Sequence, residues 1–143
     1  MIEIDTGTEV MLGRREGHVA VLTFNRPESR NALHPETYAA FERLLPQLAE
    51  DVDVGAVMLT GASGAFCAGG DVKGMNARNS GKVSSPANLE SAVDDLRARQ
   101  RSVSAALHSF PKVTVAAVDG AAAGAGLSIA LACDLRVASS RSI

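Results

Sequence analysis

Hydrophobic residues along this chain gather in short apolar runs, separated by longer segments in which apolar positions recur at helical spacing. The short runs are rich in β-branched residues, which is typical of strands. They occupy residues 18–24, 55–60, 112–118 and 134–138. Residues 10–14 are placed to pair with the first run through a turn at Glu16-Gly17. The pattern therefore predicts a series of strands that begins with a hairpin.

Three segments between or after these strands predict helices. Apolar residues recur at helical spacing from Pro35 to about Asp51, and Pro46 within this segment predicts a kink or an early stop. A second helix is expected to start at Ser85-Pro86. Its apolar stripe, which Gln100 interrupts, consists of Leu89, Val93, Leu96, Val103 and Leu107. Residues 127–133 are apolar all round, which predicts a buried helix. This alternation predicts βαβ units and a parallel sheet packed between layers.

Two glycine-rich loops, residues 61–70 and 120–126, each connect a predicted strand to the start of a helix. Their backbone N–H groups would lie at helix N-termini, where the helix dipole favours negative charge. Loops that follow neighbouring parallel strands meet at the same edge of the sheet, so these N–H groups could converge on one oxygen. That arrangement is an oxyanion hole. For either loop alone, a tight strand-to-helix connection is the alternative interpretation.

Glycine-rich loops also occur in phosphate-binding, dinucleotide-binding and serine hydrolase sites, but these motifs match none of them. Neither loop closes with GK[ST], as a Walker phosphate loop requires, and the second lacks the last small residue of a dinucleotide fingerprint. Residues 126–130 (GLSIA) are close to the serine hydrolase elbow, but their strand ends several residues earlier and all three histidines precede Ser128. We therefore favour a backbone anion site over a phosphate loop or a nucleophilic serine.

Composition narrows the class of partner. The 143 residues suffice for one domain, with an ordinary globular content of 46% hydrophobic and 21% charged residues. A formal net charge of −2 and few aromatics argue against nucleic acid. The chain has no apolar run of membrane-spanning length and no signal-peptide pattern, which predicts a cytoplasmic protein without a membrane partner. Cys67 and Cys133 are expected to be buried free thiols, and without a ligand cluster no metal or redox cofactor is predicted.

Three motifs resemble a known family: NRPESRNAL at 25–33, AFCAGGDVKGM at 65–75 and PKVTVAAVDGAAAGAGLSIALACDLRVAS at 111–139. In order and spacing they are similar to the crotonase superfamily of enoyl-CoA hydratases and isomerases. The resemblance implies an α/β fold of repeated ββα units in a spiral (the ClpP/crotonase fold). Residues 1–143 would then be the N-terminal part of a single crotonase-like domain, incomplete at the C-terminus and with apolar surface uncovered on its last strand and helix. Residues 76–85, with almost no apolar content, are expected to form a mobile loop.

The resemblance also assigns roles to residues of these motifs. It implies that the backbone N–H groups of Gly70 and Ala125 form an oxyanion hole, which polarises the thioester carbonyl of an acyl-CoA and stabilises an enolate-like anion. Ala125 stands where many members have glycine, but its N–H is still available. The residues implied to contact coenzyme A are Arg30, Asn31, Ala32, Ala68, Gly70, Asp71, Val72 and Lys73. Coenzyme A is then part of the substrate, no separate cofactor is expected, and a full-length member would be a homotrimer or hexamer.

The sequence departs from the family pattern at the acid–base residues. Family hydratases use two glutamates, of which one falls at Ser128 here and the other beyond Ile143. Ser128 is expected to cap or pack a helix start, Asp71 to cap a short helix at Val72, and Asp134 to anchor the last strand. This favours an isomerase or another single-acid enzyme over a two-glutamate hydratase. The alternatives are a non-catalytic acyl-CoA binder, an inactive truncated remnant and a subunit that assembles with a family partner.

Overall fold

The computed structural model describes residues 1–72, 76, 80–81 and 88–143. Its described strands form one six-stranded sheet in which spatial order follows sequence order. The strands are β1 (Ile2–Ile4), β2 (Met11–Glu16), β3 (Val19–Phe24), β4 (Ala56–Gly61), β5 (Val113–Val118) and β6 (Leu135–Ala138). Strand β2 is antiparallel to both of its neighbours, β1 and β3, and β3 to β6 are parallel. The predicted hairpin and the four parallel strands are confirmed, whereas β1 was not predicted.

The register of the parallel strands decides where the glycine-rich loops lie. Val19 of β3 pairs with Ala56 of β4, and Ala56 in turn pairs with Val113 of β5. Because these strands start level with one another, their carboxyl ends lie at one edge of the sheet. The two glycine-rich loops that follow β4 and β5 therefore emerge at the same edge.

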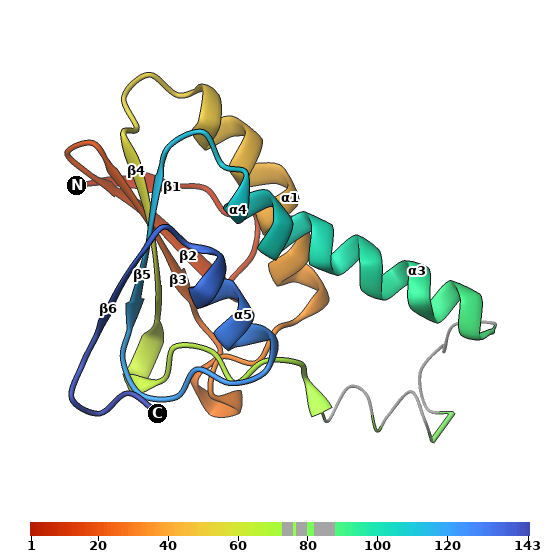
Figure 1. Cartoon of the computed structure of the whole chain (residues 1–143). Helices are drawn as coiled ribbons and strands as arrows, with labels where there is room; N and C mark the ends of the chain where they lie inside the picture. The colour runs from red at the N-terminus through yellow and green to blue at the C-terminus, as the bar shows by residue number, and fades with distance from the viewer. Residues whose placement is uncertain (73–75, 77–79, 82–87) are drawn as a thin grey trace.

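The described helices are η1 (Pro27–Ser29), α1 (Pro35–Glu50), η2 (Ala62–Gly64), α3 (Leu89–Gln100), the π-helical segment η3 (Arg101–Ala105), α4 (Ala106–His108) and α5 (Ala125–Ala132). Figure 1 shows α1, α4 and α5 on the same side of the strands. The prediction of a sheet packed between two layers is therefore wrong for the described helices. Each crossover from β3 to β6 advances in the same direction, so crossovers of one hand place α1, α4 and α5 on one face.

Helix α1 supplies the main apolar layer over the sheet. Its buried side chains include Phe41, which is fully covered and lies 6.0 Å from Phe24 between ring centroids. Burying a phenylalanine side chain of this kind stabilises the fold by roughly 1.5–3 kcal/mol. The helix continues through Pro46 to Glu50, so the expected early stop is wrong. Leu44, Leu45 and Leu48 are buried on both sides of the proline, and their packing holds the last turn in helical form.

The second long helix follows its predicted apolar stripe as far as Leu107. Its described part begins at Leu89, where Asn88 caps it by accepting a hydrogen bond from Ser91 N at 2.9 Å. The expected start at Ser85-Pro86 lies outside the described residues, as does most of the loop expected at 76–85. At its other end the helix continues through η3 into α4. Among the described helices, none combines the length and apolarity that a membrane crossing requires.

Helix α5 is buried on one face only. Ile129 and Ala130 are covered, whereas Leu127 and Leu131 are exposed. The prediction of a helix buried all round is therefore wrong, because an apolar pattern shows only that a face could be buried and not that a neighbour covers it. Leu135 and Val137 of β6 are exposed as well. The uncovered apolar surface expected on the last strand and helix is confirmed.

Candidate functional site

The two glycine-rich loops are joined by backbone hydrogen bonds. Phe66 N and Cys67 N both donate to Ala121 O at 3.0 Å, and Ala123 N donates to Cys67 O at 3.0 Å. Cys67 also pairs with Ala122 in an isolated parallel bridge. The loop after β4 and the loop after β5 therefore form one continuous backbone structure at the edge of the sheet, as the sequence predicted.

Two glycines allow this contact because a side chain at either position would separate the loops. A Cβ atom on Gly69 would lie 2.6 Å from Ala123 O and 3.2 Å from Ala125 N. A Cβ atom on Gly126 would lie 2.2 Å from Cys67 O. Gly69 also has a φ of +89°, which residues with a side chain rarely adopt. Backbone proximity here depends on the absence of side chains.

Gly70 and Ala125, the predicted oxyanion-hole donors, lie in these neighbouring segments. Ala125 is the first residue of α5, so its N–H is one of the groups that a helix leaves without an internal partner. Gly70 follows Gly69 and pairs with Leu33 in an isolated bridge, through Leu33 N donating to Gly69 O at 2.8 Å. Within the described part of the chain, neither the Gly70 N–H nor the Ala125 N–H has a hydrogen-bond acceptor.

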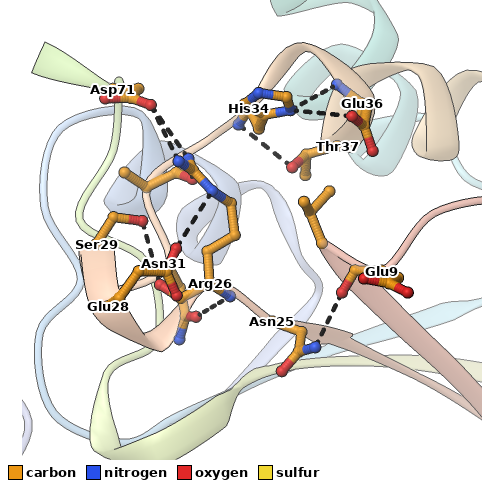
Figure 2. A network of polar contacts seen from close by, with 12 residues as sticks. Glu9, Asn25, Arg26, Glu28, Ser29, Asn31, His34, Glu36, Thr37 and Asp71 are labelled. Atoms are coloured by element: carbon orange, nitrogen blue, oxygen red, sulfur yellow. Dashed lines mark hydrogen bonds and ion pairs between the residues drawn. The ribbon is translucent and has the colours of Figure 1, made fainter. Parts of the chain in front are cut away.

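The loop before α1 is held against this region by Arg26. Its guanidinium donates to Ala32 O at 2.9 Å and, through two nitrogens, to the Asp71 carboxylate at 3.2 Å each. Figure 2 shows Arg26 reaching across from its loop to Asp71. The side chains of both residues are only 19% exposed, so the pair is partly shielded from water. Asp71 therefore holds two loops together in addition to standing just before the helical Val72.

Sequence reasoning missed the role of Arg26. The residue lies inside the NRPESRNAL motif, but it is 45 positions from Asp71, and only the fold brings the two together. The available signal was its place in a motif in which Arg30 and Asn31 already had predicted roles.

Asn31 is buried and its side chain is fully engaged. Its Oδ1 accepts from Arg26 N at 2.8 Å, and its Nδ2 donates to Ala62 O at 2.9 Å and to Ala65 O at 2.7 Å. Its backbone is left-handed, with φ of 58°. Asn31 therefore fixes the path of two loops from inside, and its predicted contact with coenzyme A would have to come from its main chain.

The other residues predicted to contact coenzyme A lie around the same edge. Ala68 N donates to Arg30 O at 3.0 Å, which places the two segments side by side, and the Arg30 side chain is exposed. Ala32 is buried, while Val72 is exposed. Lys73 lies outside the described residues. The described members of the predicted set are brought together, and their contact with a ligand stays a prediction.

Ser128 and Asp134 have structural partners. The Ser128 hydroxyl donates to Gly124 O at 3.3 Å, within the first turn of α5, as expected of a residue that packs the helix start. Asp134 accepts from Thr114 N at 2.8 Å and from Thr114 Oγ1 at 2.9 Å, which joins the start of β6 to β5. These hydrogen bonds hold the pKa of Asp134 below its usual value. The prediction that Asp134 anchors the last strand is confirmed.

Both cysteines are buried and free, as predicted. Burial raises the pKa of the Cys67 thiol to about 11, although Gly69 N lies 3.5 Å from its sulfur. Burial likewise raises the pKa of Cys133 to about 11. Since nucleophilic cysteines need a lowered pKa, these thiols are packing groups. Among the described residues, no cluster of three or more His, Cys, Asp or Glu side chains is placed to hold a metal ion.

A sheet that winds in one direction, with two glycine-rich loops paired at its edge, defines a protein of the crotonase fold. The sequence model of the family described as enoyl-CoA hydratase/isomerase matches residues 14–143. The chain therefore belongs to the enoyl-CoA hydratase/isomerase family of the crotonase superfamily.

Individual relatives agree with this assignment. The chain is 40% identical over 121 residues to the Mycobacterium tuberculosis protein named "Probable enoyl-CoA hydratase EchA14", covering 85% of this chain and 43% of that protein. It is 36% identical over 127 residues to the short-chain-enoyl-CoA hydratase of Clostridium acetobutylicum, covering 88% and 45%. A crystal structure of an enoyl-CoA hydratase from Polaromonas sp. JS666 superposes with a TM-score of 0.81 at 36% identity, covering 92% and 49%. The chain thus spans about half the length of these relatives.

Proposed function

We propose that this chain carries the thioester-binding half of an enoyl-CoA hydratase/isomerase-type site. The carbonyl oxygen of an acyl-CoA accepts hydrogen bonds from the backbone N–H groups of Gly70 and Ala125. When water adds to the β-carbon of a conjugated thioester, or when a base removes a proton from the carbon next to the carbonyl, the electron pair moves onto that oxygen, and the two donors stabilise the resulting enolate-like anion. Donors fixed in place before the reaction are effective because they need no reorganisation as the charge develops.

The observation that carries this proposal is the close approach of the two loops. Gly69 packs so tightly against the segment Ala123–Ala125 that a Cβ atom on it would lie 3.2 Å from Ala125 N. Gly70 is the next residue, and its N–H and that of Ala125 have no acceptor among the described residues. Ala125 N also lies at the N-terminus of α5, where the helix dipole favours an anion. The two N–H donors and the dipole of α5 thus favour one binding position for the carbonyl oxygen.

Coenzyme A is proposed to bind along residues 30–32 and 68–73. Its contacts there are mostly with main-chain groups, because the Asn31 side chain is occupied inside the protein and Asp71 is paired with Arg26. The exposed Arg30 side chain is available for a phosphate of coenzyme A. Coenzyme A enters as part of the substrate. For the whole protein, a cytoplasmic location and assembly into homotrimers or hexamers are also proposed.

Removing one donor tests the proposal. Ala125→Pro deletes a single N–H at the first position of a helix, where proline is tolerated, and Gly124 before it has no Cβ to clash with the ring. The matched control, Ala125→Gly, keeps the N–H. Calorimetric titration with crotonyl-CoA is expected to show binding at least about 3-fold weaker for Ala125→Pro than for Ala125→Gly, because the variant loses one hydrogen bond and places the proline Cδ where the N–H pointed. Equal affinity of the two variants for crotonyl-CoA would contradict the proposed hole.

A non-catalytic acyl-CoA binder is the second candidate for this chain. It is favoured because polar residues in the motifs already have structural partners: Ser128 bonds to its own helix and Asp134 to Thr114. A binder would keep the preference for the thioester over free coenzyme A but would neither hydrate nor isomerise it. Two assays separate the candidates: hydration of crotonyl-CoA, measured as loss of absorbance of the conjugated thioester, and isomerisation of a 3-enoyl-CoA, measured as gain of that absorbance. A binder shows neither reaction.

A further inference from the structure

The peptide group that carries the Gly70 N–H is held at its other end. Its carbonyl is that of Gly69, which accepts a hydrogen bond from Leu33 N at 2.8 Å. The C=O and the N–H of a trans peptide point in opposite directions. The bond that fixes the direction of the Gly69 carbonyl therefore also fixes the direction of the Gly70 N–H, which points away from Leu33.

The peptide group that bonds to Gly69 is held in the same way. Leu33 N belongs to the peptide whose carbonyl is that of Ala32, and Ala32 O accepts a hydrogen bond from Arg26 Nη1 at 2.9 Å. Two peptide groups thus connect the Arg26 guanidinium to the Gly70 N–H in one chain of hydrogen bonds. The last N–H of this chain, that of Gly70, has no acceptor among the described residues.

Burial strengthens this chain of hydrogen bonds. Ala32 and Leu33 are 8% and 4% exposed, and Gly69 is buried as well. Away from water a hydrogen bond is electrostatically stronger, and bonds in a chain polarise one another by about 10–30% each. The chain also begins at a cation, and hydrogen bonds from a charged donor are stronger than neutral ones. Gly70 is only partly buried, so the chain ends near the protein surface.

Arg26 is fixed in position by its own loop and by Asp71. Asn31 N donates to Arg26 O at 2.8 Å, and Arg26 N donates to Asn31 Oδ1 at 2.8 Å, so the loop closes on itself. Two guanidinium nitrogens bond to the Asp71 carboxylate at 3.2 Å each (Figure 2). Glu28 lies farther away, 3.8 Å from Arg26 Nε, with a side chain that is 70% exposed. The cation therefore occupies one defined place at the start of the chain of hydrogen bonds.

We propose that Arg26 is a positioning residue for the oxyanion hole and acts on the Gly70 N–H through the two peptide groups between them. The guanidinium fixes the direction of this N–H. By polarising the chain of hydrogen bonds, it also makes the N–H a stronger donor to the thioester carbonyl oxygen. In this role Arg26 needs no contact with the substrate. The inference rests on the proposed function, because it requires that the carbonyl oxygen binds at Gly70.

Infrared spectroscopy of a bound thioester measures this polarisation. The carbonyl of crotonyl-CoA, isotopically labelled at that carbon, absorbs at a lower wavenumber when it accepts stronger hydrogen bonds. The chain is saturated with crotonyl-CoA, so that a change in affinity does not enter the comparison. Arg26→Met keeps a long unbranched side chain but removes the charge and the N–H donors. It is expected to reduce the shift on binding by about 10–30%, the effect of losing the charged start of the chain.

The variant Asp71→Asn separates polarisation from a simple tie between two loops. It breaks the same ion pair from the other side but leaves the Arg26 cation bonded to Ala32 O, so its shift is expected to be at least as large as that of the parent. If both variants reduce the shift equally, or if Arg26→Met leaves it unchanged, the proposal is overturned. A parent chain whose bound thioester shows no shift would overturn the proposed oxyanion hole as well.

The chain of hydrogen bonds is also testable without a substitution. In the ligand-free parent, the bond from Leu33 N to Gly69 O is expected to give an NMR scalar coupling between the Leu33 nitrogen and the Gly69 carbonyl carbon. Arg26→Met, with its fold checked by circular dichroism, is expected to weaken this coupling. Absence of the coupling in the parent would overturn the proposal even if Arg26→Met does not fold.

Discussion

The contact of Gly69 with the loop at residues 120–126 can be tested by substitution, and the proposed site depends on it directly. In Gly69→Ala the new Cβ atom would lie 2.6 Å from Ala123 O and 3.2 Å from Ala125 N. Both are backbone atoms, so the clash cannot be relieved by turning a side chain. The loop that carries Gly70 and the loop that carries Ala125 must separate.

Two separate costs add up in this substitution. A left-handed φ, here +89°, costs a residue with a side chain roughly 1–2 kcal/mol. Forcing a methyl group into a packed contact costs about 1–3 kcal/mol more. We therefore expect Gly69→Ala to lower the free energy of unfolding by about 2–5 kcal/mol, which is a large fraction of the stability of an ordinary domain.

Gly64→Ala isolates the first cost. Gly64 also has a left-handed φ, +75°, but a Cβ atom on it would meet no atom within 4 Å. It is therefore expected to lose only about 1–2 kcal/mol, for its backbone conformation alone. The difference between the two variants measures the clash between the loops.

Urea unfolding followed by circular dichroism gives the free energies of unfolding of both variants. The expected difference is about 1–3 kcal/mol, with Gly69→Ala the less stable and the weaker binder of crotonyl-CoA. If the two variants lose the same stability within about 0.5 kcal/mol, the loops do not pack as described. If Gly69→Ala is the less stable but binds normally, the loops pack as described and the proposed hole is wrong.

Three further outcomes are expected. Asn31→Gly keeps the left-handed backbone accessible but removes the three hydrogen bonds of this side chain. Unfolding in urea should show a loss of about 2–4 kcal/mol, and a loss below 1 kcal/mol would contradict the network. Asp134→Asn should be less stable than the parent at neutral pH. The difference should begin to shrink as the pH falls below about 4, the pKa of an unfolded aspartate, and be lost below the lowered pKa of the folded carboxyl group; a difference independent of pH would refute its pairing with Thr114. Cys67 and Cys133 should react with a thiol reagent at pH 8 only after unfolding in urea, and rapid labelling of the folded chain would contradict their burial.

Much of the fold could be predicted from local patterns. β-branched runs marked the four parallel strands, and helical spacing marked α1 from its first residue. These predictions succeed because strand and helix periods depend on which side of an element faces the core. The stop at Pro46 was wrong because packing of the last turn outweighed the local effect of proline. The burial of Leu127 and Leu131 was wrong because exposure depends on neighbours, which no local pattern contains.

Part of the candidate site could likewise be predicted from the sequence and part could not. The glycine-rich loops and their convergence could be predicted, because parallel strands place their following loops at one edge of a sheet. The contacts that hold the loops could not be predicted, since Arg26 and Asp71, or Asn31 and Ala65, are more than 30 positions apart. The motifs showed that these residues matter without showing which atoms they touch.

By itself, the order of apolar, polar and glycine residues determined the strands, the main helices and the positions where backbone groups are left without side chains. These properties are local, because they follow from conformational preference and from the period of each element. The tertiary structure alone decided that the long helices it describes lie on one face, that Gly69 packs against Ala125, and that the apolar stripe of residues 89–107 is exposed in its first half and buried in its second. Each of these depends on the distance between segments far apart in sequence, which is fixed only when the sheet register and the packing against it are formed.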